Sequence, residues 1–179
     1  MDKKAFFKLG CYGVFAIILY SLSIQLWDYF HEGVPSHHFL ANKNLPKVSN
    51  WWGIITLPLA FAFLFYRIQL REFTNSNGID KKRIKLLILH FGLAFLYALI
   101  IAVAFSTGNS SISSFFFFGI FALGLFFPVY KSEFCLGFIL GLSYTFGGVL
   151  PLVICLVLAI ICFLLLTVSR LVWVKLVKR

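Results

Sequence analysis

The stretch DYFHEGVPSHHF, residues 28–39, concentrates the side chains best suited to metal or acid/base chemistry. It holds three of the chain's four histidines and two of its six acidic residues. Imidazole and carboxylate groups are ligands for zinc and other divalent transition metals. The same groups serve as general acids and bases near neutral pH. The candidate metal-ligating or catalytic residues are Asp28, His31, Glu32, His37 and His38.

The spacing within this stretch leaves two interpretations open. If the preceding helix continues one turn past Trp27, then Asp28, His31 and Glu32 share one face of it. HEGVPSHH does not match the HExxH pattern of helical metalloproteases, because the next histidine lies beyond a proline. One interpretation is therefore the solvated part of an outer loop. The other is a site for a divalent transition metal such as zinc.

The chain around this stretch has the composition of a membrane protein. Of its 179 residues, 61% are hydrophobic and 12% are charged, and the mean hydropathy is +0.95. Soluble domains are about half apolar and about a quarter charged, and a domain of this size exposes too much surface to hide the excess. We therefore expect an all-α polytopic integral membrane protein with a single transmembrane domain.

Six apolar segments are predicted to cross the membrane. A spanning helix needs about 20 apolar residues, with about 17 as the lower limit. The uncharged stretch 134–169 is too long for one such helix, and Gly147, Gly148 and Pro151 predict a reversal within it. The predicted spans cover residues of about 5–27, 51–67, 86–106, 112–130, 134–149 and 150–170.

The distribution of basic residues predicts that both termini are cytoplasmic. The net charge is +10, and with six spans every Lys and Arg except Lys43 and Lys47 falls on one side. Basic clusters beside apolar segments suit anionic lipid headgroups, whereas nucleic-acid binding is not expected. Short loops and the lack of eukaryotic sorting signals favour a multi-pass protein of a bacterial inner membrane.

Polar side chains gather in the outer half of the predicted bundle. They come from the first, second and fifth predicted spans, so a helical bundle would bring them near one another. We expect them to line a pocket that opens to the outside. The predicted pocket-lining residues are Gln25, Thr56, Ser143, Tyr144 and Thr145.

Small residues on the fifth predicted span indicate close helix packing. Gly137 and Gly141 form a GxxxG pattern, which Gly148 extends. Such a stripe packs against another helix of the same chain or of a different subunit. The partners that it would allow are further copies in a homo-oligomer or the subunits of a larger membrane complex. The histidine within the third span, His90, is expected to hydrogen-bond a neighbouring helix, with a proton or ligand site as the alternative.

Three classes of function fit these features. No predicted span has Asp, Glu, Lys or Arg near its centre, which argues against an ion-coupled transporter. The favoured class is a small non-catalytic protein, either an accessory or assembly partner or a ligand-binding or permeation bundle. The second is a membrane-embedded enzyme or metal-handling protein that uses the outer Asp/His/Glu cluster on a lipid-like or small substrate. The third is a channel or carrier for a small neutral solute.

Overall fold

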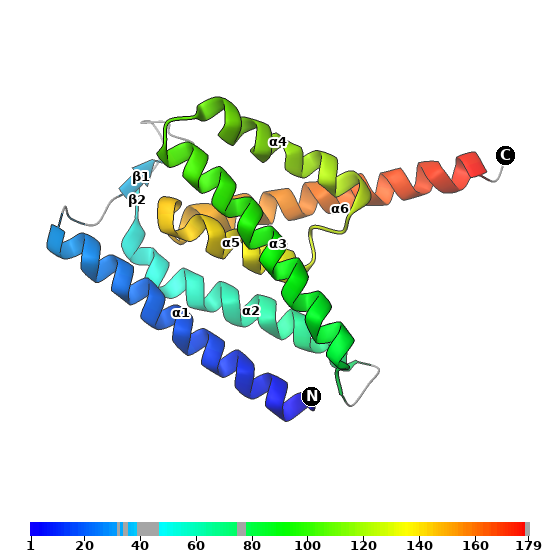
Figure 1. Cartoon of the computed structure of the whole chain (residues 1–179), viewed down its shortest axis with the longest axis horizontal. Helices are drawn as coiled ribbons and strands as arrows, with labels where there is room; N and C mark the ends of the chain where they lie inside the picture. Colours follow the sequence, from blue (N-terminus) through cyan, green and yellow to red (C-terminus); the bar gives the residue numbers. More distant parts are fainter. Residues whose placement is uncertain (32, 34–35, 39–46, 75–77, 178–179) are drawn as a thin grey trace.

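Helices dominate the computed structural model of the chain (Figure 1). The structure describes residues 1–31, 33, 36–38, 47–74 and 78–177. Its elements are α1 (Lys3–His31), β1 (Ser36–His38), β2 (Lys47–Ser49), the short 3-10 helix η2 (Asn50–Trp52), α2 (Gly53–Phe73), α3 (Lys81–Ser106), α4 (Ser110–Phe126), α5 (Ser132–Phe146) and α6 (Val149–Val177).

Four of these helices are long and apolar enough to cross a membrane: α1, α2 with η2, α3, and α6 from Val149 to Leu171. Helices α4 and α5 are apolar but have only 17 and 15 residues. At about 1.5 Å per residue they are about 26 and 22 Å long, less than the roughly 30 Å hydrocarbon core of a bilayer. The structure therefore supports a helical membrane protein with four helices of spanning length, and the six-span prediction includes two shorter ones.

Helices α3 and α5 run parallel and pack closely through the GxxxG glycines. A Cβ added at Gly137 would lie 2.2 Å from Phe91 O, and one at Gly141 would lie 2.7 Å from Phe95 O. The residue numbers of the contacts on α3 increase as those on α5 increase, so the two helices run in the same direction. The GxxxG stripe thus faces another helix of the same chain, because only glycine allows the two backbones to approach this closely.

The N-terminus is held at the connection between α2 and α3. The Met1 ammonium donates to Ile79 O at 2.9 Å, and Asp2 pairs with Gly78 in an isolated backbone bridge. This end of the bundle also carries the basic residues at the start of α1 and α3 and at the end of α2. We call it the basic end. It is defined by Lys3, Lys4, Lys8, Arg67, Arg71, Lys81, Lys82, Arg83 and Lys85.

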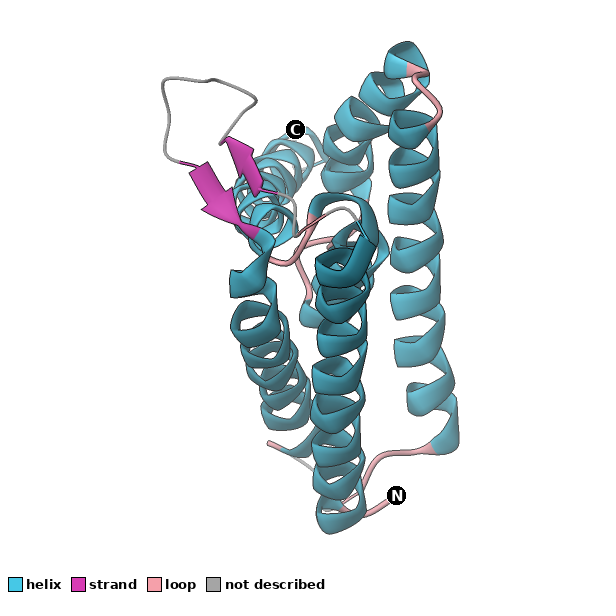
Figure 2. Ribbon diagram, turned by 90° about the vertical axis from the view of Figure 1, so that its left-hand side faces the viewer, coloured by secondary structure: helices cyan, strands magenta, loops and turns pink. Residues whose placement is uncertain are grey.

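The opposite end of the bundle contains the strand pair, drawn in magenta in Figure 2, and the turn between α5 and α6, which Figure 1 shows. Strand β1 pairs antiparallel with β2, with Ser36 opposite Ser49. At the turn, Gly147 has φ +72 and a Cβ there would lie 2.2 Å from Asn50 Oδ1. Glycine is required at this position for both reasons, and the turn is thereby fixed against the start of α2.

Helices α3 and α4 diverge from a tight turn at this opposite end (Figure 1). Gly108, with φ +76, provides the left-handed residue of the turn. Near the turn the two helices are held together by the Tyr97 hydroxyl, which donates to Phe116 O at 2.6 Å. Toward the basic end they separate, and α6 is seen in the space between them (Figure 1).

Candidate functional site

The predicted chemical stretch begins on the last turns of α1. The helix does continue past Trp27 to His31, and Gly33 follows with φ +83 and an N–H donated to Asp28 O at 2.8 Å. The ring of His31 stacks on Trp27 with centroids 4.0 Å apart, and its Nδ1 lies 2.9 Å from Trp27 O. In the structure the His31 side chain is therefore turned toward its own helix.

The remainder of the stretch is described only in part. Glu32 lies outside the described residues, and of His37 and His38 the structure describes the backbone, in β1. Within the ranges that are described, no three His, Cys, Asp or Glu side chains are grouped so that they could hold a metal ion. The zinc-type site at Asp28, His31, Glu32, His37 and His38 stays a prediction.

Two of the residues predicted to line an outer pocket lie on the first two helices, Gln25 on α1 and Thr56 on α2. Gln25 is buried, and its Nε2 would lie 3.8 Å from a Cβ added at Gly53. The Thr56 hydroxyl donates to Trp52 O at 2.9 Å, within its own helix. The Thr56 hydroxyl is thereby satisfied, whereas Gln25 Oε1 is buried and has no hydrogen-bond partner among the described residues.

The three predicted pocket residues on α5 differ in their surroundings. Ser143 is buried, donates to Leu140 O at 2.8 Å, and lies 3.0 Å from the Tyr20 hydroxyl of α1. Tyr144 is exposed, and Thr145 is half-buried. None of the five predicted residues lines the cavity described next.

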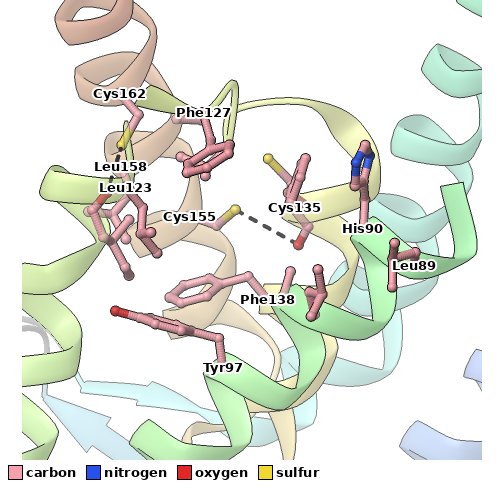
Figure 3. A pocket seen from close by; sticks show the side chains of 16 residues that line it. Leu89, His90, Tyr97, Leu123, Phe127, Cys135, Phe138, Cys155, Leu158 and Cys162 are labelled. Carbon is pink, nitrogen blue, oxygen red and sulfur yellow. Dashed lines mark hydrogen bonds between the residues drawn. The ribbon is translucent and has the colours of Figure 1, made fainter. Parts of the chain in front are cut away.

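A cavity of about 500 Å³ lies between α3, α4, α5 and α6 (Figure 3). Its wall is almost entirely apolar, and aromatic and aliphatic side chains from all four helices contribute to it. The segment that joins α4 to α5 closes one edge. The lining residues are Leu89, His90, Leu93, Ala94, Tyr97, Ile120, Leu123, Phe127, Val129, Phe134, Cys135, Phe138, Cys155, Leu158, Ala159 and Cys162.

The cavity has a buried floor and an exposed rim. On the floor, the α6 residues Cys155, Leu158 and Cys162 are buried. On the rim, the side chains of Leu89 in α3 and Phe127 after α4 are 54% and 57% exposed. The lining residues Leu93 of α3 and Leu123 of α4 are exposed as well, so the opening is lateral, between α3 and the end of α4.

Three thiols lie on the cavity wall, and each is close to a backbone carbonyl. Cys155 Sγ lies 3.9 Å from Cys135 O, which Figure 3 marks with a dashed line. Cys135 Sγ lies 3.5 Å from Tyr130 O, and Cys162 Sγ lies 3.9 Å from Ile120 O. With the weak S–H donors satisfied in this way, these cysteines act as small apolar wall residues.

A buried ionic cluster lies beside the cavity, toward the basic end. Glu133, in the first turn of α5, is only 3% exposed. Its Oε2 lies 3.0 Å from Arg71 Nη2 of α2, and its Oε1 lies 3.6 Å from His90 Nδ1 of α3. A buried charge is costly unless it is paired, so these contacts tie three helices together at one point.

The ionic cluster extends to the surface through a second carboxylate. Glu72 Oε1 lies 2.9 Å from Arg71 Nε, and Glu72 Oε2 lies 2.7 Å from Arg83 Nε. Arg71 therefore bridges two carboxylates, of Glu133 and Glu72, whose side chains are 3% and 6% exposed, and Arg83 at the end of the chain is 51% exposed. The result is a chain of alternating charges from α3 through α2 to α5.

His90 belongs to both features. Its ring stacks on Phe134 with centroids 4.6 Å apart and forms part of the cavity wall, while Nδ1 faces Glu133. Within the described part of the chain, Nδ1 has no hydrogen-bond partner. The residue expected to hydrogen-bond a neighbouring helix instead lies against a carboxylate of that helix.

Glu133 was not among the residues selected from the sequence. Hydropathy places it beside Lys131 and Ser132, where it resembles an ordinary headgroup-level residue. Glu133 is unusual because α5 begins beside His90, which lies about three turns from the start of α3. No local sequence signal indicates how far along α3 the start of α5 lies.

Comparisons with known proteins give no relative from which a function could be transferred: no family model, curated protein or solved structure matches the chain. The cavity and the ionic cluster are therefore the observations on which a functional proposal rests.

Proposed function

We propose that this protein is a small, non-catalytic, multi-pass membrane protein that binds a lipid-like molecule in the cavity between α3, α4, α5 and α6. The observation that carries the proposal is the cavity itself, with its buried apolar floor and its lateral opening. Its volume, about 500 Å³, is within the usual range of ligand pockets.

The membrane arrangement that we propose has six helices in the bilayer and both termini in the cytoplasm of a bacterium. In this arrangement the basic end is cytoplasmic, in agreement with the positive-inside rule. The short helices α4 and α5 then occupy the membrane beside longer ones, and the bilayer and flanking residues adapt to them. The basic clusters at this end lie at the level of anionic headgroups.

This placement puts the lateral opening within the cytoplasmic half of the bilayer. The rim residues Leu89 and Phe127 would face acyl chains, and the floor residues Cys155 and Leu158 would lie behind them. An apolar chain can enter such a site from the membrane without crossing water. The wall gives it close contacts with side chains of four helices, which supply dispersion energy that loosely packed lipid does not.

The ionic cluster has a supporting part in this proposal. Glu133, Arg71 and His90 fix the start of α5 against α2 and α3. Since α5 forms one wall of the cavity, these contacts keep that wall in place while α4 stands apart from α3.

The proposal is tested by blocking the cavity. Ala159 lines it from α6 and is half-buried, so Ala159→Phe places a large ring inside. Ala122 is exposed on α4 and is not a lining residue, which makes Ala122→Phe the matched control. Each protein is purified in mild detergent, and the lipid retained per molecule is measured by native mass spectrometry.

We expect wild type and Ala122→Phe to retain lipid in about equal amounts, and Ala159→Phe to retain at least tenfold less. Thermal unfolding in the same detergent checks that both variants are folded. Equal retention in all three folded proteins would contradict the proposal. So would a loss of lipid in Ala122→Phe that matches the loss in Ala159→Phe.

A further inference from the structure

The acidic residues at the basic end all have partners within the structure. Glu72 and Glu133 are paired with arginines, as described above. Asp2 accepts from Ala5 N at 2.7 Å, and Asp80 accepts from Lys81 N at 3.0 Å, so both cap helices. The carboxylates of this end are thus engaged by arginines and by backbone donors.

Two lysines near the cavity mouth lack such compensation. Among the residues that the structure describes, no acidic side chain lies within ion-pair distance of Lys85 or Lys131. Lys85 is exposed on α3, and Lys131 is half-buried just before α5. Their positive charge is therefore available to a ligand.

Both lysines are close in the sequence to residues that line the cavity. Lys85 precedes the rim residue Leu89 by four positions, so both are on one face of α3. Lys131 is the residue before α5 and lies in the chain between the lining residues Val129 and Phe134. The stacking of His90 on Phe134 brings α3 and α5 side by side at this level, and the parallel direction of these helices puts both lysines on the same side of it.

We propose that the cavity holds an acyl chain of an anionic phospholipid whose phosphate lies at Lys85 and Lys131. This rests on the function proposed above and names its ligand. The apolar wall and lateral opening accept the chain, while the two uncompensated lysines at the mouth favour an anionic over a zwitterionic headgroup. Lys85 is about one helical turn from the rim residue Leu89, which suits the separation of an acyl chain from its phosphate.

The test compares two lipids with the same acyl chains, phosphatidylglycerol and phosphatidylcholine. Their affinities for the detergent-purified full chain are measured by titration in native mass spectrometry. The variant is Lys85→Gln/Lys131→Gln. The control is Lys3→Gln/Lys4→Gln, which removes two exposed charges at the same end but away from the cavity mouth.

We expect wild type to prefer phosphatidylglycerol, and the Lys85/Lys131 variant to lose about 25-fold of that preference, about fivefold for each lysine. Its affinity for phosphatidylcholine should not change, and the Lys3/Lys4 control should behave as wild type. An equal loss in the control, or an unchanged preference in the variant, would overturn the inference. Tighter binding of farnesyl phosphate than of phosphatidylglycerol would overturn the assignment to a phospholipid.

Ala159→Phe separates the two levels of the proposal. Suppose that Ala159→Phe abolishes binding of both lipids, but that the Lys85→Gln/Lys131→Gln variant keeps the headgroup preference of wild type. Then only the assignment of the anionic headgroup fails. If Ala159→Phe leaves both lipids bound as in wild type, the cavity is not the binding site, and the proposed function fails with it.

Discussion

At the scale of single residues, Glu133 is the most constrained side chain of the site. It is a buried carboxylate held between an arginine of α2 and a histidine of α3. Removing one partner of a buried ion pair is more harmful than removing both, because the remaining charge keeps its desolvation cost without its compensation. Arg71 is one third exposed, which lowers that cost through solvent screening.

A double-mutant cycle on this pair tests the constraint. We expect Arg71→Met to lower the free energy of unfolding by about 2 kcal/mol, because it leaves Glu133 with only His90. Adding Glu133→Gln to that variant should restore part of the loss. The measurement is unfolding in mixed detergent micelles as denaturing detergent is added. Strictly additive effects of the two substitutions would show that the pair is not coupled in this way.

Residue types alone could identify some of the chemistry but not its location. The sequence directed attention to Asp28, His31 and the residues after them, because their types are suited to a site. It missed Glu133, whose significance comes from three helices meeting around it. A single carboxylate beside a lysine carries no sign in the sequence of being 3% exposed.

At the scale of elements, the fit of α5 against α3 fixes the inner wall of the cavity. Gly141 lies so close to α3 that an added Cβ would be 2.6 Å from Ala98 Cβ and 2.7 Å from Phe95 O. A clash with a backbone carbonyl cannot be relieved by rotating a side chain. One helix must therefore move, and the cavity wall moves with it.

Gly141→Ala is expected to destabilise the protein by about 1–3 kcal/mol through overpacking. The matched control is Gly92→Ala on α3, where nothing lies within 4 Å of the added Cβ. Alanine is the better helix former by up to about 1 kcal/mol, so the control should be neutral or slightly stabilising. Thermal unfolding in detergent measures both. A Gly141→Ala variant as stable as Gly92→Ala would contradict the close approach of α3 and α5.

Element types were more predictable than element ends. The predicted first span, 5–27, lies inside α1, and the predicted reversal in 134–169 corresponds to the turn at Gly147. The pairing of β1 with β2 was not predicted, because three-residue strands are too short to show an alternating pattern. The predicted spans 112–130 and 134–149 overlap α4 and α5, but their ends differ by two to four residues, because hydropathy does not mark where an apolar helix begins and ends.

At the scale of the whole molecule, the divergence of α3 and α4 creates the candidate site. Their angle depends on the Gly108 turn, on the Tyr97 contact near it, and on α5 and α6 packing behind them. None of this is present in the periodicity of a single segment, which is why the sequence could indicate a membrane bundle but not a cavity. If the cavity is the binding site, lipid must occupy the space behind the opening.

That requirement is tested most directly by photo-crosslinking in a membrane. A phospholipid with a diazirine in its acyl chain is incorporated into vesicles with the reconstituted protein, illuminated, and the labelled peptides are sequenced by mass spectrometry. We expect adducts on the buried floor residues of α6, above all Leu158 and Cys162, and their loss in Ala159→Phe. Adducts confined to exposed residues such as Phe15 and Leu19 of α1, with none on the floor, would contradict lipid binding in the cavity.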